Sequence, residues 1–139
     1  MQKSKFIEEF PELTDKLVLN VDDNEMNQLV ISQIMKNVGI HIICVNNGAE
    51  AVDKLEGGLK PDFILMDLQM PVLNGVQTAE IIKKKINKEI PIIINTGYVT
   101  PQERWRLGRL GIKEFLEKPY SMQDIFSKLS RQLIVIQHD

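Results

Sequence analysis

Short apolar runs alternate along the chain with stretches in which apolar residues recur at helical spacing. The apolar runs predict five strands, at residues 17–21, 40–45, 63–66, 91–97 and 115–119. Residues 63–66 are apolar without interruption, a pattern typical of a central strand in a parallel sheet that helices cover on both faces. Asp67 follows this run directly. A carboxylate therefore stands where the most buried strand is predicted to end.

Helices are predicted after each of these strands. The first begins near Glu25 and places Val30, Ile31, Ile34 and Val38 on one face, before a glycine at residue 39. The others are predicted to begin near Asn47, Gly75, Thr100 and Ser121, with the last one reaching about residue 137. Strict alternation of strand and helix indicates an α/β domain with a parallel sheet and right-handed crossovers.

The first 15 residues are mostly polar and charged, with Phe6, Ile7 and Phe10 as possible contacts. We interpret residues 1–15 as a tail, a linker or a short extra helix, and residues 16–139 as one domain. No continuous apolar segment at the start resembles a signal peptide. No apolar run approaches the ~20 residues that span a bilayer. We therefore expect no membrane association.

The composition is that of an ordinary globular domain. Its 139 residues suit a single core, and the formal net charge of −2 gives no strong attraction to nucleic acid or anionic lipid. Direct nucleic-acid binding is therefore not expected. The single cysteine, Cys44, permits no internal disulfide and suits a reducing compartment, so the expected location is the cytoplasm.

Chemically active side chains follow the predicted strands. The first strand ends in Asp22 and Asp23, the third in Asp67, the fourth in Thr96 and the fifth in Lys118. In a parallel sheet these ends share one edge, where ligands of open α/β sheets bind. Three neighbouring carboxylates repel one another unless a cation joins them, and oxygen ligands favour Mg²⁺. No histidine or cysteine lies near these strand ends, which argues against zinc.

This set of groups suits phosphoryl transfer. Asp67 can act as a nucleophile that forms an aspartyl phosphate. Lys118 can neutralise an incoming phosphoryl oxygen, and Thr96 can donate a hydrogen bond to another. A metal ion would balance charge on the phosphoryl group as it moves.

The motifs resemble those of the receiver domain of two-component response regulators, over about residues 16–136. The matching stretches are Val21-Asp22-Asp23-Asn24, Met66-Asp67-Leu68-Gln69-Met70-Pro71 with Gly75, Asn95-Thr96-Gly97, and Phe115-Leu116-Glu117-Lys118-Pro119. The amino-acid sequence around Asp67 most resembles that of receiver domains of hybrid histidine kinases. The resemblance implies a doubly wound, flavodoxin-like (βα)5 fold whose five parallel strands have the order 2-1-3-4-5.

The resemblance also implies roles and partners. Asp67 would accept phosphate from a histidine kinase or a histidine phosphotransfer protein. Asp23 would bind Mg²⁺ directly, Asp22 mainly through water, and the backbone carbonyl of Gln69 would be a further ligand. Thr96 and Phe115 would form a switch pair. Phosphorylation would then change the surface made by the fourth helix, the fifth strand and the fifth helix, which could also support a homodimer.

Several alternatives stay open from the sequence. A degenerate receiver would bind a partner constitutively without taking phosphate. A phosphatase with an aspartate nucleophile would need a general acid where Gln69 stands. A flavin-binding module would need a phosphate loop where Asp22 and Asp23 would repel the phosphate. The carboxylates at 22 and 23 could also simply cap the first helix. The protein is expected to be either a stand-alone regulator or a piece of a hybrid kinase.

Two aromatic residues lie outside these motifs. Trp105 lies about 200° around its predicted helix from Leu107, so we expect it to be partly exposed. Tyr98 and Gln69 stand two residues beyond Thr96 and Asp67. As a hypothesis, their bulk borders the path of the hydrolytic water and slows phosphate loss.

Overall fold

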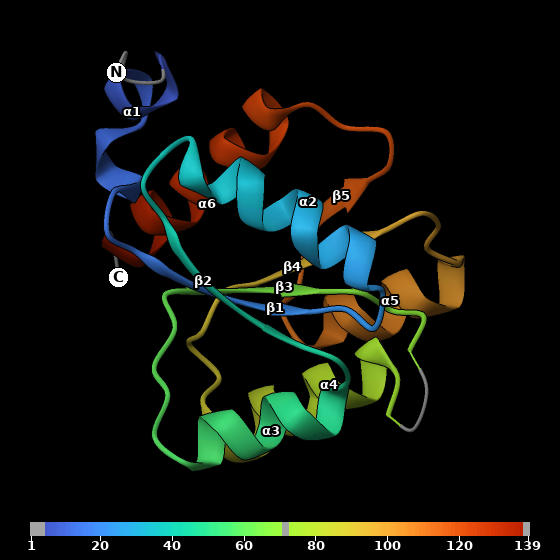
Figure 1. The fold of residues 1–139 in the computed structure, drawn as a ribbon. Helices are drawn as coiled ribbons and strands as arrows, with labels where there is room; N and C mark the ends of the chain where they lie inside the picture. Colours follow the sequence, from blue (N-terminus) through green and yellow to red (C-terminus); the bar gives the residue numbers. More distant parts are fainter. Residues whose placement is uncertain (1–4, 71–72, 138–139) are drawn as a thin grey trace.

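Five parallel strands form one sheet between two layers of helices in the computed structural model, which describes residues 5–70 and 73–137 (Figure 1). The strand order β2-β1-β3-β4-β5 confirms the predicted 2-1-3-4-5 topology. The strands are β1 Leu17–Val21, β2 His41–Val45, β3 Phe63–Met66, β4 Ile92–Thr96 and β5 Glu114–Glu117. All four neighbouring pairs are parallel, as crossover connections through helices require.

The helices divide between the two faces of the sheet. One face is covered by α2 and α6, and the other by α3, α4 and α5 (Figure 1). Their bounds are α2 Glu25–Lys36, α3 Gly48–Glu56, α4 Gly75–Ile81, α5 Pro101–Arg109 and α6 Met122–Gln137. The helix predicted from Gly75 continues beyond α4 as a π-helical segment, η2 Ile82–Ile86. A fold of this kind is doubly wound, as expected.

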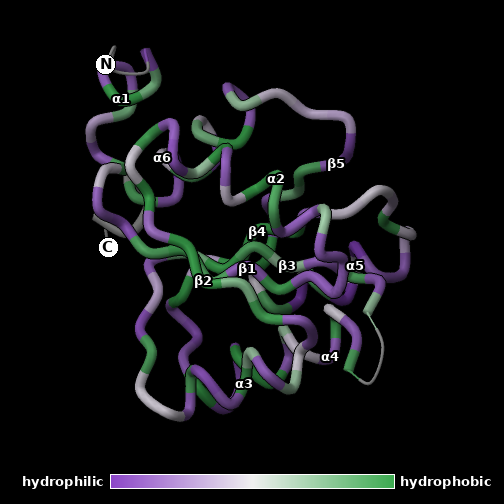
Figure 2. The backbone as a smooth tube through the Cα atoms, viewed as in Figure 1, coloured by the Kyte–Doolittle hydropathy of each residue, from purple (hydrophilic) through white to green (hydrophobic). Residues whose placement is uncertain are grey.

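The central strand β3 is buried on both sides, which explains its unbroken apolar sequence. Phe63 and Leu65 belong to the core under α2 and α6, whereas Ile64 and Met66 belong to the core under α3, α4 and α5. All four side chains are fully buried. The strands accordingly trace through the most hydrophobic part of the chain (Figure 2).

The predicted core face of α2 is partly wrong. Ile31 and Met35 are the buried residues of this helix, and Met35 was not among the predicted core positions. Val30 is 52% exposed, next to Met26 and Leu29, which are also exposed. Ile31 and Met35 are about one helical turn apart and therefore lie on the same face of α2. Val30 lies about 100° around the helix from Ile31, outside that face. The apolar width of α2 therefore exceeds the width that the core uses.

The N-terminal segment packs on the domain rather than trailing from it. It forms the short helix α1 Lys5–Glu9 and the 3-10 turn η1 Pro11–Leu13. The rings of Phe6 and Phe10 lie 5.0 and 5.9 Å from the ring of Phe126 on α6. Of the three sequence interpretations of this segment, the short helix is the one found. Pro71 and the side chain of Ile136, which the predictions included, lie outside the described residues.

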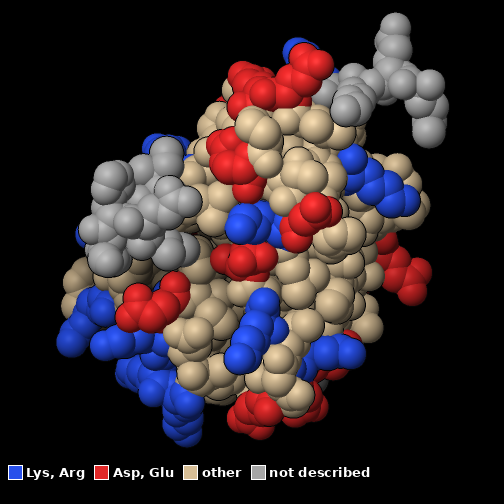
Figure 3. Space-filling model, turned by 90° about the vertical axis from the view of Figure 1, so that its left-hand side faces the viewer, with Lys and Arg blue, Asp and Glu red and all other residues tan. Residues whose placement is uncertain are grey.

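Charges are unevenly distributed over the surface. Figure 3 shows Lys and Arg side chains gathered at the lower left of one face, while acidic side chains are spread over the rest. The small net charge thus conceals local basic regions. Across the described part of the chain, no helix combines the length and the apolar character that crossing a membrane would need.

Candidate functional site

Three carboxylates meet at the carboxyl edge of the sheet. Val21 of β1 pairs with Met66 of β3, so Asp22 and Asp67 follow at corresponding positions of two neighbouring strands. One carboxylate oxygen from each of Asp22, Asp23 and Asp67 lies within 4.8 Å of the others. The convergence predicted from the strand ends is therefore present.

Asp67 is half-buried and holds two hydrogen bonds on the same oxygen. Its Oδ1 accepts from the backbone N–H of Gln69 and from the Thr96 hydroxyl, each at 3.2 Å. Burial raises the pKa of Asp67, and the charge of Asp22 raises it further. The two hydrogen bonds and the positive charge of Lys118 act in the opposite direction. Because burial dominates, the Asp67 carboxylate is less well solvated than an exposed aspartate, which favours its use as a nucleophile.

Asp22 is only 3% exposed, yet no basic side chain in the described part of the chain pairs with it. Its Oδ1 accepts from the backbone N–H of Asn24 at 2.9 Å. Among the described residues, no lysine or arginine forms an ion pair with any of the three carboxylates. A buried carboxylate beside two others is costly without a countercharge. This donor set of carboxylate oxygens fits a hard divalent cation such as Mg²⁺.

The helix-capping alternative for the two aspartates does not hold. The N-cap of α2 is Asn24, whose side chain accepts from the backbone N–H of Asn27 at 2.8 Å. Asp22 and Asp23 precede that cap, and each brings one carboxylate oxygen within 4.8 Å of an oxygen of Asp67. Gln28, which the sequence reasoning did not single out, donates from Nε2 to the backbone carbonyl of Asp22 at 2.6 Å and so braces this loop.

Lys118 lies beside the site but just beyond its strand. The prediction placed it within the fifth strand, whereas β5 ends at Glu117. Its backbone N–H donates to the carbonyl of Thr96 at 3.3 Å, which ties the end of β5 to the end of β4. The Lys118 side chain is exposed, and its charge lowers the pKa of Asp67. It is therefore free to meet an oxygen that enters from solvent.

Phe115, the predicted switch partner of Thr96, is half-buried on β5. The guanidinium of Arg104 lies 4.3 Å from the centroid of its ring and also pairs with Glu117 at 2.5 Å. Glu117 is in turn the register partner of Thr96. A short path of contacts thus leads from Asp67 through Thr96 and β5 to α5. A side chain at Gly97 would meet nothing within 4 Å, so space is available beside this path.

Comparison with known proteins identifies the family of this chain. Residues 18–130 match the response regulator receiver domain. The chain belongs to this family. It is 31% identical to two-component response regulator 24 of Arabidopsis thaliana, over 99% of each chain. It is also 33% identical to the sensor histidine kinase CheAY of Helicobacter pylori, covering 86% of this chain but only 15% of that kinase.

One similar solved structure is a receiver domain that contains magnesium. The receiver domain of a sensor histidine kinase from Pseudomonas aeruginosa shares 30% identity, with a TM-score of 0.76 over 86% of this chain and 98% of that one. That structure holds a magnesium ion coordinated in the active site cleft. The present receiver has an acidic cluster at the carboxyl edge of its sheet.

A glycine brings α4 close to the site of this receiver. The backbone N–H of Gly75 donates to the carbonyl of Leu68 at 3.2 Å. A Cβ on Gly75 would lie 2.3 Å from the backbone oxygen of Asp67 and 2.7 Å from the Cα of Leu68. Only glycine permits this approach, which explains why the residue belongs to the Asp67 motif.

A cavity of about 370 Å³ adjoins the acidic cluster of the receiver, between α2 and the loop after β5. Its lining combines Asp22 and Lys118 with Asn27, Val30, Ile31, Ile34, Asn95, Pro119 and Tyr120. Burial raises the pKa of Tyr120, partly offset by a hydrogen bond from Asn95. Sequence reasoning did not single out Tyr120, and it named Asn95 only as part of the Asn95-Thr96-Gly97 motif, although a polar residue within the apolar run of β4 was a visible signal.

Proposed function

We propose that this receiver takes a phosphoryl group onto Asp67 and relays it within a two-component system or phosphorelay. The observation that carries the proposal is the convergence of Asp22, Asp23, Asp67 and Thr96 at one edge of the sheet. Mg²⁺ held by the three carboxylates and the Gln69 carbonyl would balance negative charge on the phosphoryl oxygens. The chain would act on no other substrate than its own phosphoryl group.

The side chains have distinct tasks in this transfer. An oxygen of the Asp67 carboxylate attacks phosphorus, and the bond from phosphorus to the donor nitrogen or oxygen breaks, so the electron pair leaves with the donor. The Thr96 hydroxyl turns from Asp67 Oδ1 to a phosphoryl oxygen. The Lys118 ammonium, exposed at the rim, neutralises another. Water later attacks phosphorus, releases phosphate and restores the carboxylate.

The competing functions fit the site less well. Gln69 exposes a side chain that cannot supply the proton a phosphatase needs for its leaving group. A flavin phosphate would meet Asp22 and Asp23, with no lysine or arginine paired to them among the described residues. A degenerate receiver is the remaining alternative, and the experiment below separates it from the proposal.

The phosphodonor is proposed to be a histidine kinase or a histidine phosphotransfer protein. A protein donor must cover the surface around Asp67 to bring its phosphohistidine within bonding distance. Helix α2 begins directly after the aspartates and exposes three apolar side chains, Met26, Leu29 and Val30, at 66, 58 and 52%. Exposed apolar residues beside an acidic site suit a protein contact. We expect the donor to dock on them.

The output surface is proposed to be α5, β5 and α6. Phosphorylation would draw the Thr96 hydroxyl away from Asp67 and let the Phe115 ring move inward, because the two residues lie on neighbouring strands. Arg104 covers that ring and pairs with Glu117, so the movement would rearrange an exposed ion pair. The rearranged surface would contact a downstream partner or a second receiver as a homodimer.

Intact-protein mass after incubation with acetyl phosphate, with and without Mg²⁺, tests the proposal. The native chain should gain one phosphoryl group only with Mg²⁺, and Asp67→Asn should gain none. Asp53→Asn, at an exposed aspartate on α3, is the matched control and should behave like the native chain. Absence of any gain in the native chain would favour the degenerate receiver. A gain that persists in Asp67→Asn would move the phosphoacceptor elsewhere.

A protein donor gives the second measurement. Leu29→Asp should leave phosphorylation by acetyl phosphate unchanged, because Leu29 is exposed on α2 and supplies no group to the acidic cluster. The same variant should slow transfer from a phosphorylated histidine phosphotransfer protein, since a charge would enter an apolar contact. If the phosphotransfer protein phosphorylates the native chain and Leu29→Asp at the same rate, α2 is not part of the docking surface.

A further inference from the structure

A groove separates α5 from α4 and η2, away from the aspartates. It encloses about 280 Å³ and is lined by Glu80, Lys84, Trp105, Arg106, Arg109 and Leu110. Trp105 is 63% exposed, as its position opposite Leu107 predicted, and the guanidinium of Arg109 lies 5.1 Å from the centroid of its ring. Solvent exposure of so large an aromatic side chain beside a groove marks a contact surface.

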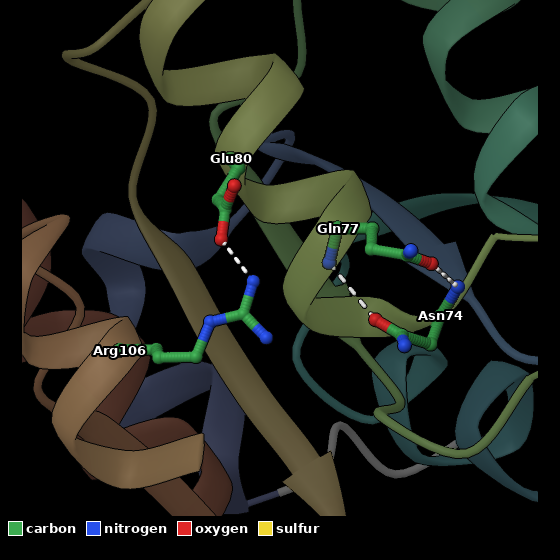
Figure 4. Close-up of polar contacts among 4 residues, drawn as sticks. All are labelled: Asn74, Gln77, Glu80 and Arg106. Atoms are coloured by element: carbon green, nitrogen blue, oxygen red, sulfur yellow. Dashed lines mark hydrogen bonds and ion pairs between the residues drawn. The ribbon is translucent and has the colours of Figure 1, made fainter. Parts of the chain in front are cut away.

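One ion pair fixes the width of this groove. Arg106 on α5 donates to the Glu80 carboxylate on α4 at 2.5 Å (Figure 4). Glu80 lies one turn beyond the N-terminal capping box formed by Asn74 and Gln77, so its helix is held at the start (Figure 4). The two walls of the groove are therefore tied together, and the charge of Arg106 is already neutralised.

The remaining charges of the groove are positive. Among the described residues, Lys84 and Arg109 have no carboxylate within 4.0 Å. Lys85 adds a further exposed cation on η2. Lys83 is committed elsewhere, because its ammonium donates to the carbonyls of Lys88 and Ile90 at 2.9 and 2.6 Å. Two uncompensated cations thus flank an exposed indole and the half-buried Leu110.

We propose that this groove binds an acidic segment of a partner protein, with one apolar side chain seated against Trp105 and Leu110. Carboxylates on either side of that side chain would pair with Lys84 and Arg109. The volume suits one or two side chains, and Lys84 and Arg109 provide separate cations, whereas the continuous phosphates of a nucleic acid strand need a row of them. A protein segment is therefore favoured over nucleic acid. The groove uses no residue of the phosphoacceptor site.

The single tryptophan of the chain provides a direct reporter. The probe is a synthetic peptide of Asp and Glu residues around one leucine, without aromatic residues and with blocked ends. Its titration into the native chain should give a saturable change in Trp105 fluorescence that weakens as ionic strength rises. Replacing the leucine of the peptide by serine should weaken binding, because the apolar contact with the indole is lost.

Charge reversals identify the site. Lys84→Glu and Arg109→Glu should each weaken the peptide about tenfold, as expected when a cation that faces a carboxylate becomes repulsive. The matched control is Lys36→Glu, at an exposed lysine on α2 across the sheet, which should bind like the native chain. Circular dichroism shows whether each variant is folded. Asp67→Asn should bind normally, so failure of the phosphorylation proposal would leave this one intact.

Three outcomes would overturn the inference. One is a titration with no saturable change in fluorescence. Another is an equal loss of affinity in Lys36→Glu, which would indicate unspecific attraction between charges. The third is tighter binding of a single-stranded oligothymidine than of the peptide, which would make the groove a nucleic-acid surface.

Discussion

Replacing Gly75 by alanine should destabilise the fold and damage the phosphoacceptor site together. The φ angle of Gly75 lies outside the left-handed region, so the substitution causes no backbone strain of its own. The cost is steric, because the new Cβ would stand 2.3 Å from the backbone oxygen of Asp67, where ordinary contacts begin at 3.4 Å. The start of α4 must therefore move by about 1 Å from the loop that carries the nucleophile.

The size of the effect follows from two opposing contributions. Alanine is intrinsically favoured over glycine in a helix by up to ~1 kcal/mol. Overpacking typically costs ~1–3 kcal/mol, and the upper end applies here because the clashing atoms are backbone atoms of Asp67 and Leu68 that cannot rotate away. We expect the free energy of unfolding to fall by about 2 kcal/mol, which lowers the urea midpoint by about 1 M.

Gly108→Ala is the matched control within the same fold. Gly108 is exposed inside α5, and a Cβ there meets nothing within 4 Å. This variant should gain ~0.5–1 kcal/mol, because the unfolded chain loses freedom without any clash. Urea unfolding measures both variants, and the rate of phosphorylation by acetyl phosphate should fall in Gly75→Ala alone. A Gly75→Ala protein as stable as native, or stabilised like its control, would refute the close approach.

Further predictions concern titration, packing and lifetime. Burial raises the pKa of Asp67 above 3.8, so the folded chain holds this proton more tightly than the unfolded chain, and ionisation costs stability. At neutral pH and without Mg²⁺, Asp67→Asn should therefore unfold at a higher urea concentration than the native chain. This difference in stability should shrink as the pH falls through the raised pKa of Asp67 towards 3.8. A difference that persists at low pH would show that ionisation of Asp67 is not its cause. Phe6→Ala should lower the free energy of unfolding by ~3 kcal/mol, because the ring is buried and its centroid lies 5.0 Å from that of Phe126. An unchanged urea midpoint would mean that α1 does not stabilise the fold. Tyr98→Ala should shorten the lifetime of the phosphorylated chain several-fold in a decay assay, because less bulk would border the path of the hydrolytic water. An unchanged decay rate would show that Tyr98 does not slow the loss of phosphate.

Much of this fold was predictable because its elements obey simple rules. A strand covered on both faces must be apolar throughout, and residues 63–66 meet that requirement. The helix predicted to begin near Thr100 is present and starts with a capping box, in which the Glu103 side chain accepts from the Thr100 backbone N–H. The site was predictable for a topological reason. Parallel strands bring their carboxyl ends to one edge, so Asp22 and Asp67 had to meet once the strands were located.

Other features depend on packing that no local pattern reveals. At the start of α3 the Asn47 side chain caps the backbone N–H of Glu50, but the Glu50 carboxylate accepts from the backbone N–H of Asn46 rather than of Asn47, so no full capping box forms. Burial of the N-terminal segment depends on Phe126, which is more than a hundred residues away in the sequence. The π-helical segment after α4 leaves the apolar periodicity nearly unchanged, so the sequence predicts an ordinary helix there.

The error at Val30 is informative in its own right. A helix that only covers a sheet needs one apolar stripe, which Ile31 and Met35 provide in α2. Met26, Leu29 and Val30 add a second apolar strip that faces solvent and lies outside the core. Departures from a folding rule concentrate where a protein contacts other molecules. The exposed strip begins within a few residues of the aspartates, so the position where the core prediction failed lies on the surface where the proposed phosphodonor would dock.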